Sequence, residues 1–365
     1  MLRRYAWIVR WWGLSRLLVF VPAIVSQAVG WPQRAPSLDS RPLDLLTSWD
    51  GRWYRAIANH GYLVLPGSGH QNDTAFFPLY PIALRALREL GLSLNAGGLL
   101  LANAAFLVGL VALYELARNW VAEADARRTV VYAALFPFGF VFSMVYPEGL
   151  VLAAAAIAGV LALRGRWLGC ALAVACATLA RPEGVFLTLP VLAIAFRSWN
   201  GLDEGSRGRA VVAILAGPLS LLAFGLYQWH VTGDALAFSH AQAAWGRTTT
   251  PGGIYTALVK LVHAPTASRG WLYRDAAFCL VYLICLVLAY RARVPRAWIV
   301  AGALIVLLPL ISGSWQSDAR FGLLALPVYC GLAYAARRRW LDGALRVASG
   351  TLLALGSATI LLHWP

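Results

Sequence analysis

Charged residues are scarce in this 365-residue sequence: they make up 13% of it, while 60% of the residues are hydrophobic. Soluble domains carry about 25% charged and about 45–50% apolar residues. The apolar residues lie in long blocks that lack charges, which excludes a large soluble domain and is typical of helices that cross a membrane.

Paired cysteines and clustered metal ligands are also lacking. None of the five cysteines belongs to a CxxC pair. Cys170 lies near the end of an apolar block and the other four lie inside such blocks, so all are expected to be small buried side chains. His60 and His70 have no suitably spaced carboxylate partner, and no metal site or other cofactor is expected.

The formal net charge of +15 raises the question of nucleic-acid binding. The arginines, however, form short clusters between the apolar blocks, at 118–128, 164–166, 197–209, 291–296 and 337–342. The positive-inside rule produces this distribution in membrane proteins. Nucleic acid is therefore not an expected partner, whereas the lipid bilayer is.

Eleven apolar blocks predict an all-α, polytopic transmembrane bundle of about 11 spans. They are residues 11–30, 97–117, 129–146, 149–163, 167–180, 184–196, 210–229, 276–290, 297–311, 321–336 and 343–362. Several are shorter than the roughly 20 residues that a straight span needs, so those between 149 and 196 are either thin hairpins or partly re-entrant. The basic start lacks a cleavage site and is typical of a signal anchor. No internal repeat is evident, and residues 1–365 are expected to form one domain.

The arginine clusters predict a cytoplasmic N-terminus. Loops 31–96 and 230–275, the turns near Tyr146 and Arg181, and residues 312–320 would then share the outer face. They hold most of the acidic residues and histidines. The first loop has amphipathic stretches, which are expected to form interfacial helices. Loops of this length are candidates for a functional site.

Asp50 is the main candidate for a catalytic residue. It lies between Trp49 and Trp53 shortly after the first apolar block. A carboxylate beside apolar and aromatic surface is partly removed from water and is suited to abstracting a proton. The alternative is a solvated loop residue or the N-cap of the helix that follows.

Arg181 lies at an outer turn, where the positive-inside rule does not call for an arginine. Its guanidinium would suit a phosphate through paired hydrogen bonds. The alternative is that it pairs with Glu183 or Glu148 and only fastens the turn. Aromatic rings and carboxylates on this face would suit a saccharide, and apolar walls a lipid tail. The residues expected to bind substrate are Trp49, Arg52, His60, Tyr80, Glu148, Arg181, Glu183, Asp234, Gln242, Trp245 and Arg247.

Five stretches resemble one known family, in order, between about residues 45 and 250. Residues 49–62 resemble its W-D-x-x-x-(F/Y)-x-x-I-A-x-x-G-Y pattern and 75–81 its A-F-F-P-L-Y-P run. Residues 136–148 and 181–184 are similar to its P-x-x-x-x-(F/Y)-S-x-x-Y-S-E and R-x-(N/E)-G patterns. Residues 233–247 resemble the G-D-P-L-A-F-x-x-A-Q-x-x-W-G-R of its bacterial members. This is the PIG-V or GPI mannosyltransferase 2-like group. Pro147 and Ala235 depart from it.

The resemblance implies a GT-C glycosyltransferase that moves a sugar, mannose by analogy, from a polyprenyl-phosphate carrier to an acceptor on the non-cytoplasmic face. It implies inverting transfer with Asp50 as the base and without a metal. Arg181 or Arg247 would stabilise the leaving phosphate, and Glu148 and Asp234 would bind sugar hydroxyls. The compact length and short basic loops favour a bacterial plasma membrane, where the acceptor would be a glycolipid, polysaccharide or protein.

Two other functions stay open from the sequence. A transporter or flippase for a lipid-linked substrate would be expected to show polar residues at the midplane and repeat symmetry between its halves, and the sequence shows neither. A non-catalytic subunit of a glycan-assembly complex is the second alternative.

The expected orientation can be checked by cysteine labelling in a background without native cysteines. Because the arginine clusters predict outer loops at 31–96 and 230–275, cysteines at positions 73 and 240 should react with an impermeant reagent in intact cells. Labelling only after the cytoplasmic face is opened would reverse the orientation.

Overall fold

The computed structural model describes residues 2–31, 43–62, 71–247 and 252–360, and these residues form helices and turns without a strand. The all-helical expectation is therefore confirmed for the described chain. Its α-helices are α1 (Leu2–Val29), α2 (Gly51–His60), α3 (Leu79–Glu89), α4 (Leu94–Ala117), α5 (Glu123–Leu135), α6 (Glu148–Leu163), α7 (Trp167–Ala180), α8 (Thr188–Ser198), α9 (Glu204–Thr232), α10 (Ala237–His240), α11 (Gly253–Val262), α12 (Thr266–Arg291), α13 (Arg296–Ile311), α14 (Asp318–Phe321), α15 (Pro327–Ala335) and α16 (Arg339–Ala358).

Four described helices are long and apolar enough to cross a membrane: α1 from residue 4, α4, α9, and α12 from residue 268. The apolar helices α6, α7, α11 and α13 are shorter. The count of eleven spans is thus not confirmed.

Several expected spans are divided by breaks in the helix. The block 129–146 is one example, because α5 ends at Leu135 and a 3₁₀ helix, η3 (Gly139–Ser143), follows. Pro137 explains this end, since the residue before a proline is disfavoured in the helical region. The block 184–196 begins within the 3₁₀ helix η4 (Pro182–Leu187), and Pro327 starts α15 anew after residues 322–324.

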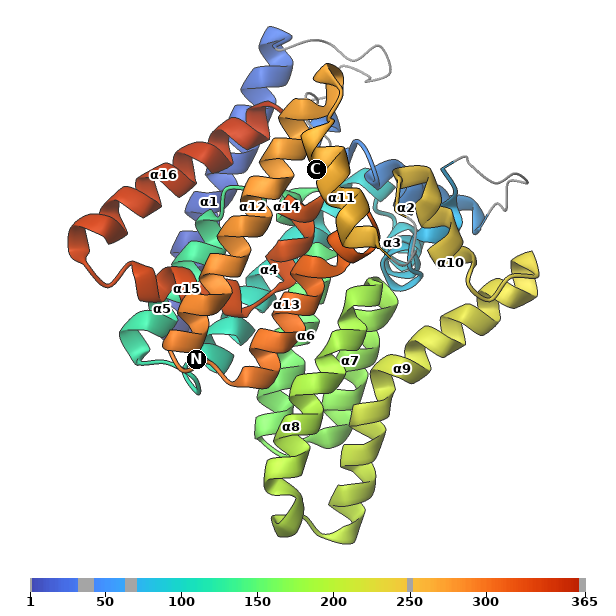
Figure 1. Ribbon diagram of the computed structural model, residues 1–365, viewed down its shortest axis with the longest axis vertical. Helices are drawn as coiled ribbons and strands as arrows, with labels where there is room; N and C mark the ends of the chain where they lie inside the picture. Colours follow the sequence, from blue (N-terminus) through green and yellow to red (C-terminus); the bar gives the residue numbers. More distant parts are fainter. Residues whose placement is uncertain (1, 32–42, 63–70, 248–251, 361–365) are drawn as a thin grey trace.

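The helices pack partly in sequence order and partly across the chain. Helices α4, α6, α7 and α9 contact one another in succession, α12 packs on α15 and α13, and α1 lies along α16 (Figure 1). Close approach depends on glycine: a Cβ on Gly149 would lie 2.7 Å from the carbonyl oxygen of Ala102. Small residues are the usual means by which membrane helices approach closely.

The expected amphipathic helices of the first long loop are α2 and α3. Their buried side chains include Tyr54, Ile57, Tyr80 and Leu84, which pack together with Val145 over one end of the bundle. The short elements α10, α11 and α14 gather at the same end (Figure 1).

Two of the arginine-rich turns lie beside the start of α1. Arg4, Arg118 and Arg164 all form ion pairs with Glu115. The turns 118–128 and 164–166 are therefore close together, while the end of the bundle that faces the cytoplasm stays a prediction. His70 and the expected outer C-terminus at 363–365 lie outside the described residues.

Gly331 gives a test of the packing between α12 and α15. A Cβ there would lie 1.9 Å from the carbonyl oxygen of Cys285. Gly331→Ala should therefore lower the melting temperature in detergent, because overpacking costs about 1–3 kcal/mol and exceeds the gain of about 1 kcal/mol in helix propensity. Gly343→Ala in α16, where nothing lies within 4 Å of the added atom, is the matched control and should melt no earlier than the parent. Equal melting of the two variants would contradict the packing.

Candidate active site

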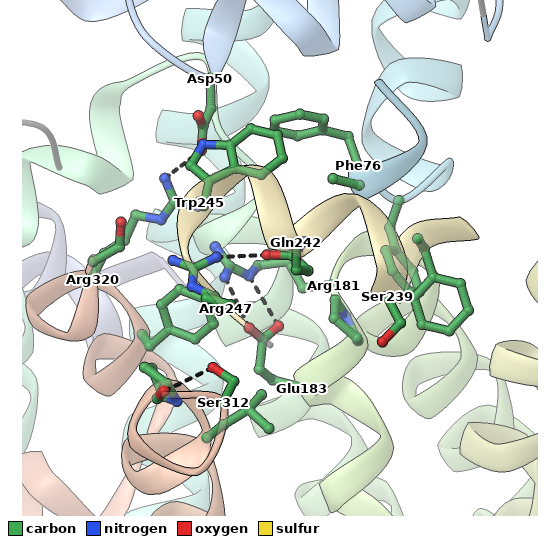
Figure 2. A pocket seen from close by; sticks show the side chains of 18 of the residues that line it. Asp50, Phe76, Arg181, Glu183, Ser239, Gln242, Trp245, Arg247, Ser312 and Arg320 are labelled. Carbon is green, nitrogen blue, oxygen red and sulfur yellow. Dashed lines mark hydrogen bonds and ion pairs between the residues drawn. The ribbon is translucent and has the colours of Figure 1, made fainter. Parts of the chain in front are cut away.

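A cavity of about 220 Å³ lies where the connecting segments gather. Its lining comes from segments far apart in the chain, at residues 50–54, 75–77, 180–183, 238–247 and 308–321. Figure 2 shows Asp50, Trp245 and Arg320 on one side of this space, with Arg181, Glu183 and Arg247 next to them. The described outer loops and turns that sequence analysis assigned to a common face therefore share one site.

Asp50 immediately precedes α2 and is buried, with 5% of its surface exposed. It occupies the N-cap position, but its carboxylate makes no capping hydrogen bond. Its backbone N–H donates to the hydroxyl of Tyr146 at 3.1 Å. Oδ2 accepts a hydrogen bond from Nη1 of Arg320 at 2.6 Å, and Oδ1 has no hydrogen-bond partner among the described residues. The capping alternative thus does not account for this side chain.

A chain of buried ion pairs extends from Asp50. Nε of Arg320 lies 3.0 Å from Oε1 of Glu148, and the same oxygen pairs with Arg181. Arg181 also donates two hydrogen bonds to Glu183, at 2.9 and 3.1 Å. Since isolated buried charges are unfavourable, this alternation of three carboxylates and two guanidinium groups is what allows them to lie in the protein interior.

Arg247 differs from the other two arginines of the cavity. It donates hydrogen bonds to Oε1 of Gln242 at 2.7 Å and to the carbonyl of Gln316 at 2.9 Å. No carboxylate among the described residues forms an ion pair with it. Burial, together with the nearby Arg320 and Arg181, lowers the pKa of its guanidinium to about 10, although Asp50 and Glu183 attract the charge. Arg247 is therefore a positive group at the cavity that no described carboxylate contacts directly.

Phe321 provides the surface on which the three guanidinium groups meet. Their central carbons lie 4.6 Å (Arg181), 4.9 Å (Arg247) and 6.0 Å (Arg320) from the centroid of the ring. The negative face of an aromatic ring attracts cations within about 6 Å. The ring therefore offsets part of the repulsion that remains between the three positively charged guanidinium groups.

Six of the residues expected to act in catalysis or binding line the cavity: Asp50, Arg181, Glu183, Gln242, Trp245 and Arg247. Glu148 lies behind them, fully buried between Arg181 and Arg320.

The other five expected residues do not line the cavity. The indole N–H of Trp49 donates to the carbonyl of Ile360, and the hydroxyl of Tyr80 donates to that of Gly98. The remaining three lie at the surface of the described structure, and they are Arg52, His60 and Asp234, the last paired with His240. These side chains point elsewhere because helical periodicity and local pairing, which the motif does not show, decide their direction.

Arg320 is the member of the site that the sequence-based list lacks. It lies in α14, after Ser317, which has a positive φ of 65°. Arg320 shares one sequence feature with Arg181: both arginines lie at expected outer turns, where the positive-inside rule does not call for them. Its pairing with a residue 270 positions away could not be seen in the sequence.

The described residues include no group of three or more histidine, cysteine, aspartate or glutamate side chains that could hold a metal ion. Arginines separate the three carboxylates of the site. That the reaction needs no metal stays a prediction.

No protein-family model and no curated protein matches this chain. The archaeal oligosaccharyltransferase AglB from Archaeoglobus fulgidus, in complex with an inhibitory peptide and a dolichol-phosphate, is similar with a TM-score of 0.45 and 13% identity. That match covers 99% of this chain and 56% of the other. The oligosaccharyltransferase of the same organism with Zn and sulfate has a TM-score of 0.45 and 14% identity, covering 97% and 52%. This chain spans about half the length of those proteins, and similarity at this level assigns neither family nor activity.

The ion-pair chain predicts a large effect on stability at Arg181. Arg181→Ala leaves Glu148 and Glu183 without their shared partner, and breaking a buried pair from one side costs about 3–5 kcal/mol. The melting temperature in detergent should fall clearly, and replacing Glu183 by alanine as well should recover part of the loss. Arg85→Ala, an exposed position in α3, is the control. Similar melting of Arg181→Ala and Arg85→Ala would show that the ion pairs contribute little.

Proposed function

We propose that this protein is a membrane glycosyltransferase of the GT-C type that transfers a sugar from a polyprenyl-phosphate carrier to an acceptor hydroxyl. One observation carries the proposal. Segments 49–62, 75–81, 136–148, 181–184 and 233–247, which resemble the PIG-V group, contribute to one buried cavity or to the ion pairs behind it. That cavity contains a carboxylate with a free oxygen and a guanidinium that no described carboxylate contacts directly.

Asp50 is suited to act as the base. Arg320 binds Oδ2, which orients the carboxylate, while Oδ1 remains available for an acceptor hydroxyl. As the acceptor oxygen bonds to the anomeric carbon, its proton passes to Asp50. The bond from that carbon to the phosphate oxygen breaks, and the phosphate leaves with the electron pair. A single displacement of this kind inverts the anomeric centre.

Arg247 is the better phosphate ligand of the two arginines that the sequence proposed. Arg181 already pairs with Glu148 and Glu183, so a phosphate would have to compete with two carboxylates. Arg247 has only neutral partners, and the negative charge of a bound phosphodiester would neutralise it. Fixed cations at the leaving oxygen stabilise the charge that develops in the transition state.

The remaining lining suits a sugar attached to a lipid. The rings of Phe76 and Trp245 offer stacking surface, and Gln242 and Ser239 offer hydrogen bonds to hydroxyls. Phe77, Phe238 and Leu308 give the cavity an apolar wall that fits the start of an isoprenoid chain. Mannose as the sugar, and a carrier with one phosphate, are proposed from the resemblance to the PIG-V group.

Asp50→Asn should abolish transfer because the amide keeps the shape of the side chain and cannot accept the proton. General base catalysis contributes about 100- to 10,000-fold, so the rate from labelled polyprenyl-phosphate mannose in membranes should fall by at least about 100-fold. Glu204→Gln, an exposed carboxylate at the start of α9, is the control and should keep full activity. Activity of Asp50→Asn within a few-fold of the parent would refute the role of Asp50 as the base.

Absence of transfer by the parent with several lipid-linked sugars would favour a non-catalytic subunit.

The two arginines should respond differently to replacement by lysine. Loss of a charge-assisted hydrogen bond costs roughly 1–3 kcal/mol, so Arg247→Lys should raise the KM for the donor by about 5- to 150-fold. Arg181→Lys should change the donor KM little and act mainly on stability. The donor-concentration dependence of both variants, with melting temperatures measured on the same samples, decides the assignment. If Arg181→Lys raises the donor KM and Arg247→Lys does not, the phosphate ligand is Arg181 rather than Arg247.

A further inference from the structure

A second cavity, of about 700 Å³, lies on another face of α2. Asp50 and Tyr54 face the first cavity, whereas Arg55 and Asn59 face this one, and the two linings have no residue in common. We call the second cavity the η1–α2 groove, after α2 and the 3₁₀ helix η1 (Asp44–Thr47). The start of α4 closes its other side.

Asp44 is an unpaired buried carboxylate in this groove. Only 8% of its surface is exposed, and it lines the cavity. Its side-chain oxygens have no hydrogen-bond or ion-pair partner among the described residues. Because this carboxylate lines the groove and no protein donor occupies it, it is available to accept hydrogen bonds from a ligand bound there.

Arg55 does not provide a phosphate site in the groove. It donates to Oδ1 of Asn95 at 2.6 Å, to the carbonyl of Thr47 at 3.0 Å and to that of Gly51 at 3.1 Å. These bonds join η1, α2 and α4, which makes Arg55 part of the groove's wall. Because the positive charge of Arg55 balances the negative charge of Asp44, the groove has little net attraction for an anion.

The lining is instead suited to a neutral polyhydroxyl ligand. Beside Asp44 it presents the side chains of Ser93 and Asn95, which offer hydroxyl and amide groups, and the apolar surfaces of Leu94 and Leu99. Carboxylates and amides are good acceptors for pairs of sugar hydroxyls, and apolar side chains cover the C–H face of a sugar ring. A saccharide satisfies both parts of this lining.

The groove is close to the proposed base. Thr47 lines it and Asp50 lines the first cavity, and three residues of chain span at most about 10 Å. We propose that the η1–α2 groove binds a saccharide unit of the acceptor, near the hydroxyl that reacts at Asp50. The role as acceptor site rests on the proposed function, whereas binding of a saccharide can be tested without any transfer.

The test uses cysteine protection on the full chain in detergent, with the five native cysteines replaced. Ala96 is exposed and lines the groove, and Leu90 is an exposed position outside it. The rates at which a methanethiosulfonate reagent labels Ala96→Cys and Leu90→Cys are measured with mannotriose, maltotriose or sn-glycerol 3-phosphate. At least one trisaccharide should slow labelling at position 96 by about 5-fold or more. Labelling at position 90 and labelling in the presence of glycerol phosphate should not change.

Adding Asp44→Asn should remove the protection while the melting temperature stays near that of the parent. In the transfer assay this variant should raise the KM for a saccharide acceptor and leave the KM for the donor unchanged. Equal labelling with and without each trisaccharide, or protection by glycerol phosphate alone, would overturn the proposal. Protection without any transfer by the parent would leave the groove as a saccharide site and refute the proposed function instead.

Discussion

The site depends on one constraint: three carboxylates and two guanidinium groups lie in the interior of an apolar helical bundle, and each must face a charge of opposite sign. Asp50, Arg320, Glu148, Arg181 and Glu183 do so by alternating in sign. All of these contacts except the one between Arg181 and Glu183 join segments distant in the chain. The same interactions that make the charges tolerable therefore also connect α2, α6, η4 and α14. Loss of one member would leave its neighbours as uncompensated buried charges, which is far less favourable than loss of a surface pair.

This arrangement leaves two groups with unused capacity, Oδ1 of Asp50 and the guanidinium of Arg247. A glycosyl transfer needs an acceptor for a proton and a cation for the leaving phosphate, and these two groups match those needs. Arg181, which has the stronger sequence signal, is fully occupied by carboxylates. The distribution of partners, rather than the residue type, thus distinguishes a group available to substrate from one that supports the site.

Short helices are part of how the site forms. Helix α7 ends at Ala180 just before Arg181, α10 and η6 carry the 238–245 lining, and α14 supplies Arg320. Irregular backbone at membrane depth is tolerated where it is buried in protein or lines a cavity. The break at η4 is therefore located where side chains converge on the cavity, whereas those at Pro137 and Pro327 lie outside its lining.

The sequence by itself determined the helical class and six of the cavity residues, because hydropathy and local motifs are properties of short segments. It did not determine the count of long spans, since Pro137 and Pro327 divide blocks that hydropathy alone treats as continuous. The pairing of Arg320 with Asp50 was decided only by tertiary structure. It depends on which segments, hundreds of residues apart, are brought together, because a buried charge takes the partner that the packing places within reach.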